Sequence, residues 1–189
     1  MGDTNQKSDG RYIAALVASF DSEDGASREK ARKSLVAIGE PAVSRLVKAM
    51  KNESDQVRWE AAKTLVQIAS ENSAESLVNA LRDKSFEVRW LAADGLINIG
   101  IRSTEPLLQA LIDHPSNAML LEGAHHVLSH LAVKDISSLH HIESHLKDTD
   151  AGMGQVLKPI LAAIESPTPA IDVPLAAKSA LTLVKSSRK

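Results

Sequence analysis

Two stretches of the chain are near copies of each other. Residues 57–69 read VRWEAAKTLVQIA, and residues 88–100, which begin 31 positions later, read VRWLAADGLINIG. Both copies have the same residues at seven equivalent places: valine, arginine, tryptophan, two alanines, leucine and isoleucine. A period of about 20–50 residues is typical of proteins built from repeated supersecondary units. This repeat constrains the fold more than any other feature of the sequence.

The same pattern continues on both sides of the two copies. Ala31 and Leu35 lie 30 positions before Ala61 and Leu65, and an Ile-Gly or Ile-Ala pair closes each long segment. Glycine favours a helix end, and proline suits the first turn of the helix that follows. Each unit is therefore predicted to be a long helix followed by a short one. The expected helices are 11–20, 26–39, one after Pro41 that includes 45–50, 55–69, 74–82, 86–99, 105–112, a long helix through Ala124 and Leu131, 136–146, 150–165 and 174–184.

The predicted domain boundaries follow from this alignment. Because 11–20 matches the short helix at 45–50, the repeats begin with a half repeat. The segment SPTPA at 166–170 is predicted to be extended, since each proline disfavours helix at the residue before it. We expect a flexible N-terminus at 1–9, a solenoid at 10–165, a Pro-rich connector at 166–173, a capping helix at 174–186 and a tail at 187–189.

The long helix is amphipathic at a helical period. Placed about 100° apart, Ala61, Leu65 and Ile68 share one face, while Glu60 and Lys63 are expected on the opposite, exposed face, with Gln67. A hairpin of two such helices cannot cover its apolar faces alone. Neighbouring hairpins must stack into a continuous core, which predicts an all-α solenoid.

Composition narrows the functional classes. The chain has 189 residues, 3% aromatic residues, no cysteine and a formal net charge of −2. Without cysteine there is no disulfide, no Cys-ligated zinc and no catalytic thiol, and a near-neutral charge gives no general attraction to nucleic acid. No run approaches the roughly 18 apolar residues of a membrane span. We expect a cytoplasmic protein that has no membrane partner.

The pattern V-R-W-x-A-A-x-x-L, followed by an Ile-Gly or Ile-Ala turn and a short L-V-x-A-L helix, resembles the HEAT-like repeats named for phycobilisome (PBS) lyases. The resemblance implies a right-handed alpha-alpha superhelix of about five hairpins, with first helices on the convex side and second helices on the concave side. It also implies an inter-repeat ladder in which an Asp stands six residues before the Arg. Asp83 and Arg89 match that spacing, whereas Asn52 stands six residues before Arg58.

Arginine and tryptophan of the repeat are assigned structural roles. Arg58 and Arg89 lie toward the apolar face in a first helical turn, where they need carboxylate or carbonyl partners from the preceding turn. Trp59 and Trp90 stand at the edge of the apolar face, so we expect them to pack against the adjacent hairpin rather than to stack on a nucleic-acid base.

The spacing of the histidines suggests a metal site, but their predicted positions on the helices do not favour one. Two motifs, at 125–130 and 140–145, each place histidines four positions apart on a helix. His126 and His130 align with the outer face of the long helices, whereas His141 aligns with the other surface. We therefore expect neither a metal site nor any other cofactor.

The concave face carries the candidate partner-binding residues. Exposed positions of successive short helices line up in a mildly cationic stripe. Three of its cations, Lys51, Arg82 and Lys147, also suit the last helical turns that they occupy, whatever the ligand. The stripe consists of Arg45, Lys48, Lys51, Asn79, Arg82, Gln109, His141, Ser144 and Lys147.

The first helix, YIAALVASF, is apolar all round. It has Ala15 and Ala18 where the next short helix has Arg45 and Lys48. Such a helix should be covered by residues 1–9, by a second copy or by a partner, unless its alanines only reflect helix propensity.

Three functions remain open at this stage. We expect a non-catalytic scaffold or adaptor that binds another, acidic protein along the concave face. The first alternative is a bilin lyase or lyase-accessory subunit that binds a tetrapyrrole, as the resemblance implies. The second is nucleic-acid binding through the cationic stripe, which the overall charge disfavours.

Overall fold

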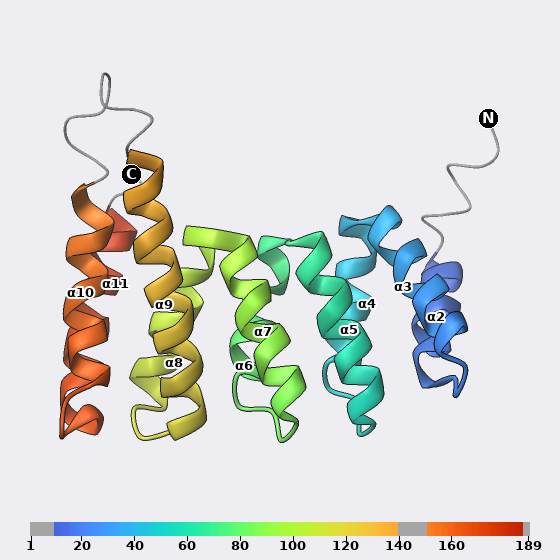
Figure 1. Ribbon diagram of the computed structural model, residues 1–189, viewed down its shortest axis with the longest axis horizontal. Coiled ribbons are helices and arrows are strands. Elements are labelled where there is room, and N and C mark those ends of the chain that lie inside the picture. The colour runs from blue at the N-terminus through green and yellow to red at the C-terminus, as the bar shows by residue number, and fades with distance from the viewer. Residues whose placement is uncertain (1–9, 140–150, 187–189) are drawn as a thin grey trace. The chain divides into compact units, whose positions relative to one another are not determined.

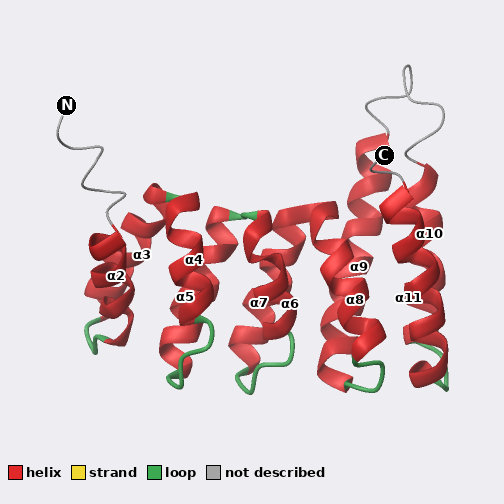
Figure 2. Ribbon diagram, turned by 180° about the vertical axis from the view of Figure 1, so that it is seen from behind, coloured by secondary structure: helices red, strands yellow, loops and turns green. Residues whose placement is uncertain are grey.

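In the computed structural model, residues 10–139 and 151–186 are described, and these are helices joined by short loops without any strand (Figure 2). The chain divides into two compact units, residues 1–99 and residues 100–189. The all-α class expected from the periodicity is confirmed. None of the helices within the described ranges is long and apolar enough to cross a membrane.

The first unit consists of long and short helices in alternation (Figure 1). The long helices α3, α5 and α7 pack on one another in that order, while α4 packs on α2 and α5, and α6 packs on α7. Its elements are α2 (Gly10–Ala18), η1 (Ser19–Asp21), α3 (Gly25–Ile38), α4 (Glu40–Ala49), α5 (Asp55–Ile68), η2 (Glu71–Ser73), α6 (Ala74–Ala80) and α7 (Phe86–Ile99).

The helix ends follow from local chemistry. Asp24 caps α3 by accepting hydrogen bonds from the amides of Ala26 and Ser27. Gly39 ends α3 at a φ of 71°, a left-handed value that glycine adopts readily. Ala69 ends α5 at a φ of 52°, where an alanine is strained. The Ile-Gly and Ile-Ala pairs therefore mark helix ends, as the sequence predicts.

The core of the first unit lies between the stacked hairpins. The repeated alanine and leucine of each long helix are buried, with Leu35, Leu65 and Leu96 fully inaccessible. Helix α6 approaches α7 so closely that a Cβ built on Gly95 would lie 2.8 Å from Cδ1 of Leu77. Glycine at this position permits the two helices to touch.

Glu60 corrects the predicted exposed face of α5. The sequence places it opposite the apolar residues, but the structure buries it to 2% exposure. The physical reason is that Arg28 and Arg32 of α3 lie against its carboxylate and form ion pairs with it.

The second unit contains η3 (Gly100–Ser103), α8 (Thr104–Asp113), α9 (Ala118–Leu139), α10 (Ala151–Ile164) and α11 (Pro169–Ser186). Helix α11 packs on α8 and α10, and α9 packs on α8 and α10. Leucine is the commonest residue of the core in the described part of this unit, as at Leu107, Leu111 and Leu128.

Two boundaries in the second unit differ from the predicted ones. Helix α9 continues to Leu139 without the expected break before 136, because 132–139 contain neither glycine nor proline; residues 140–146 of the expected short helix lie outside the described residues. Helix α11 begins at Pro169 rather than 174, so the extended connector is shorter than 166–173. Proline is favoured at a first helical position, and Asp172 accepts hydrogen bonds from the hydroxyls of Ser166 and Thr168 there. The other domain boundaries stay predictions.

Candidate functional site

The candidate site is the solvent-exposed side of α4 in the first unit, with the grooves on its two flanks; we call it the α4 face. Arg45, Lys48 and Lys51 are exposed on three successive turns along α4 and the loop after it. None of the three forms an ion pair within residues 10–139 and 151–186. Their charges are therefore available to a ligand.

The first groove lies between α2 and α4 and has a volume of about 440 Å³. Small and aliphatic side chains form most of its lining, and Arg45 and Lys48 lie on its α4 side. Its lining residues are Ala14, Val17, Ala18, Asp21, Arg45, Lys48, Ala49, Asn52 and Val57. The α2–α4 groove thus combines an apolar floor with two cations.

The second groove lies between α4 and α6 and has a volume of about 260 Å³. It contains Lys51 and Asn79, but also the carboxylates of Glu75 and Asp83. Asn72, another lining residue, donates a hydrogen bond of 2.6 Å from Nδ2 to Oε1 of Glu40 at the start of α4. This hydrogen bond, followed by one from Ser70, lowers the pKa of Glu40. The α4–α6 groove is more polar and less cationic than the α2–α4 groove.

Arginines of the long helices contrast with these cations because they are paired inside the unit. Nη1 of Arg58 donates to the carbonyls of Asn52 and Glu53, both at 2.8 Å. Nη1 of Arg89 donates in the same way to the carbonyls of Asp83 and Lys84. These hydrogen bonds hold each arginine against the turn that precedes its own helix.

Carboxylates connect successive repeats, in a pattern that the sequence predicts only in part. Asp83 binds Arg58 of the preceding repeat through both oxygens, while Arg89 uses the backbone of Asp83. Where Asn52 departs from the expected Asp, Glu60 binds Arg28 and Arg32 instead. Sequence reasoning missed Glu60. Its separation of 32 residues from Arg28, close to one repeat of about 30, is the sequence signal that would have identified it.

The two tryptophans differ in their surroundings. Trp59 is half-buried, and Nζ of Lys63 lies 4.3 Å from its ring centroid. Trp90 is 50% exposed and stacks on Phe86 with a centroid separation of 6.4 Å. Half of Trp90 is therefore open to solvent, and its stacking partner Phe86 belongs to the same helix.

The remaining predicted site residues do not all gather at the α4 face. Arg82 donates to Oδ1 of Asn79 at 2.9 Å on the first unit, whereas Gln109 belongs to the second unit and donates to Asp113 at 3.1 Å. His141, Ser144 and Lys147 lie outside the described residues. The structure thus places Arg45 and Lys48 in one groove beside α4, Lys51 and Asn79 in the other, and Arg82 next to Asn79.

Described histidines make ordinary side-chain contacts. Nε2 of His125 lies 2.9 Å from Oε1 of Glu165, and the rings of His126 and His130 are 4.4 Å apart. The described residues contain no group of three histidines or carboxylates with the geometry to hold a metal ion.

Comparison with known proteins supports the repeat assignment. A family model described as HEAT repeats matches residues 13–86, and the HEAT-type resemblance is thereby confirmed. No curated protein matches the sequence.

Solved structures resemble the chain at low sequence identity. One chain from the complex of CpcE and CpcF of phycocyanin lyase from Nostoc sp. PCC7120 is 23% identical, with a TM-score of 0.50, over 88% of this chain and 98% of that one. An engineered protein is 21% identical, with a TM-score of 0.41, over 92% of this chain and 96% of that one. The similarity to the lyase complex shows the fold alone.

Proposed function

We propose that this chain, which carries HEAT repeats over residues 13–86, is a non-catalytic protein-interaction module that binds an acidic partner protein across the α4 face. The observation that carries the proposal is the row formed by Arg45, Lys48 and Lys51. All three side chains are exposed, and none is in an ion pair within the described part of the chain. Complementary charge across an interface steers association and selects the partner.

The charge balance of the first unit indicates that an acidic partner is attracted by the α4 face and not by the unit as a whole. Residues 10–99 contain 13 Lys and Arg and 13 Asp and Glu, a balance of 13 − 13 = 0. The acidic partner must therefore recognise the α4 face itself. The same balance gives no support to binding along a nucleic-acid backbone.

The test begins with a partner captured from a lysate of the native host, whose affinity is then measured with purified proteins. Lys48→Glu combined with Lys51→Glu should weaken the complex at least about tenfold. The matched control is Lys30→Glu combined with Lys33→Glu on α3, which changes net charge equally at exposed positions. Equal affinities of the two double variants for the partner contradict the proposal.

Two alternatives are tested with the same purified protein. An absorbance shift on adding a bilin supports the lyase or lyase-accessory function, and affinity for an oligonucleotide that falls steeply with salt supports nucleic-acid binding. The cytoplasmic location and the self-association through α2 stay predictions.

A further inference from the structure

We infer that the α2–α4 groove receives an aliphatic side chain from an acidic amphipathic helix of the partner, while carboxylates on that helix bind Arg45 and Lys48. This inference rests on the proposed function and names the chemistry of the partner segment. An amphipathic helix places apolar anchors at i, i+3 or i+4 into an apolar groove.

The two helices beside the groove carry side chains of unequal size at equivalent repeat positions. Helix α2 contributes Ala14 and Ala18 to the groove, at the positions where α4 has Ser44 and Lys48. Because both alanines have only a methyl side chain, the α2 side of the groove is lined by small apolar groups, with Val17 and Val57 also in the lining. Filling the groove with an aliphatic side chain removes apolar surface from water on both partners.

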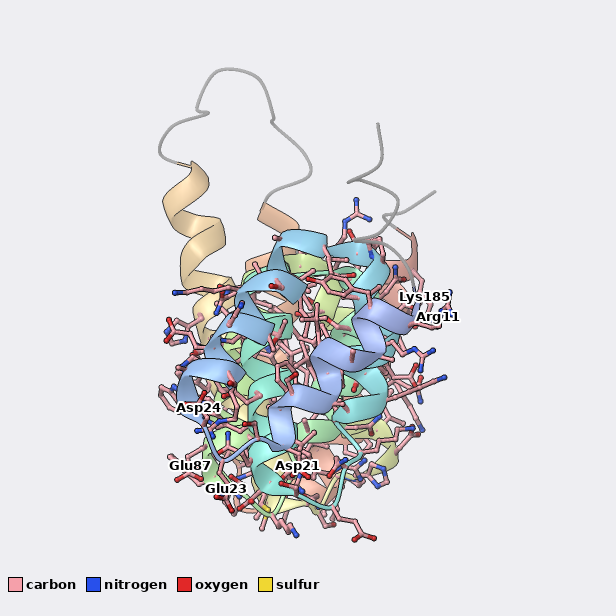
Figure 3. The ribbon with its side chains drawn as sticks, turned by 90° about the vertical axis from the view of Figure 1, so that its right-hand side faces the viewer. Arg11, Asp21, Glu23, Asp24, Glu87 and Lys185 are labelled. Carbon is pink, nitrogen blue, oxygen red and sulfur yellow. The ribbon has the colours of Figure 1, made fainter. Side chains whose placement is uncertain are left out.

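The charged side chains of the groove are separated by sign. Arg45 and Lys48 lie on the α4 side, whereas the one carboxylate of the lining, Asp21, lies in η1. Figure 3 shows Asp21 at the end of the α2–η1 segment away from Arg11. The partner's carboxylates therefore belong beside α4, and its aliphatic anchor belongs over the α2 alanines.

Residues 1–9 do not match this chemistry. Their sequence, MGDTNQKSD, contains one large apolar residue, Met1, and two carboxylates at Asp3 and Asp9. A segment of this kind lacks the second apolar anchor, one or two helical turns away, that an amphipathic helix presents.

The test uses a fluorescently labelled helical peptide of about 14 residues, with leucine at every third or fourth position and glutamate at the flanking positions. Binding to the full-length chain is measured by anisotropy. Ala18→Phe fills the groove from an exposed position, and Ala15→Phe is the matched control, since Ala15 is exposed on the same helix and does not line the groove. We expect Ala18→Phe to weaken binding at least about tenfold and Ala15→Phe to change it less than about twofold.

Two altered peptides provide a test that does not depend on folding of the variants. Replacing the leucines with serine, or the glutamates with lysine, should each abolish binding. If Lys48→Glu removes binding while Ala18→Phe has no effect, the groove inference is wrong and the charged α4 face stands. If neither variant affects binding, both proposals are wrong. Sedimentation measures the mass of the particle that each variant forms. If Ala18→Phe lowers this mass and Ala15→Phe does not, a second copy of the chain occupies the groove, and the inference is wrong.

Discussion

Arg58 of α5 and Asp83, which lies in the loop between α6 and α7, are joined by two hydrogen bonds. Nε of Arg58 donates to Oδ2 at 2.8 Å and Nη2 donates to Oδ1 at 3.0 Å. The side chains are 5% and 11% exposed. Because the two residues belong to successive repeats, the pair fixes one hairpin against the next.

Asp83→Ala should lower the free energy of unfolding by about 3–5 kcal/mol, since it leaves the buried Arg58 guanidinium without its carboxylate. Urea denaturation measures the change. Lys84→Ala, at an exposed position in the same loop, is the control and should have little effect. Equal stability of both variants would show that the pair contributes nothing.

Glu60→Ala should also be strongly destabilising, by about 3–5 kcal/mol, because Arg28 and Arg32 lose the carboxylate they share. Glu29→Ala removes the exposed partner of Lys33 and should have no more than a small effect. The comparison is made in the same urea titration. Similar losses for the two variants contradict the role assigned to Glu60.

Ala69→Gly should raise the free energy of unfolding by about 0.5–1 kcal/mol. Glycine removes the strain of the left-handed backbone at position 69, which increases stability. The greater conformational freedom of glycine in the unfolded chain offsets part of this gain. Gly39→Ala should have the opposite effect, since Gly39 also has a positive φ. Thermal unfolding of both variants tests whether stability increases in Ala69→Gly and decreases in Gly39→Ala.

Asp24 should contribute a pH-dependent part of stability. The Ser27 hydroxyl, followed by the amides of Ala26 and Ser27, holds the pKa of Asp24 below its ordinary value of 3.8. A lowered pKa in the folded state stabilises the fold above pH 3.8, and this contribution is lost as pH falls through the folded value.

An NMR titration of the Asp24 carboxyl measures its pKa directly. Ser27→Ala should raise this pKa toward 3.8, because it removes the first cause of the shift. Asp24→Asn should flatten the dependence of stability on pH in the same range. An unchanged titration in Ser27→Ala would assign the shift to another group.

Thr104→Val should stabilise the second unit by about 1 kcal/mol. Oγ1 of Thr104 is buried and has no hydrogen-bond partner among the described residues, so replacing it with a methyl group removes a desolvation cost. Thr64→Val is the opposite case, because Oγ1 of Thr64 donates to the Glu60 carbonyl at 2.6 Å. It should lower stability by about 0.5–1.5 kcal/mol. Chemical denaturation of both variants tests the contrast.

Much of the candidate site follows from repeat alignment. Arg45, Lys48 and Lys51 fall on the exposed positions of one short helix by periodicity alone, and the structure exposes all three. Gln109 also follows the alignment, yet it belongs to the other compact unit. Periodicity assigns a residue to a face of its own helix, but it contains no information about which faces form one surface.

The sequence by itself determined the helical repeat, the ends of the first-unit helices and the buried alanines and leucines. These features depend on the helical period, on capping residues and on glycine, all of which act over a few neighbouring positions. Tertiary structure alone decided that Glu60 is buried, that its carboxylate binds Arg28 and Arg32 of the preceding repeat, and that the α2 alanines line a groove beside the α4 cations. Each of these depends on side chains that are distant in sequence, and their distance and relative size become defined only when the hairpins pack.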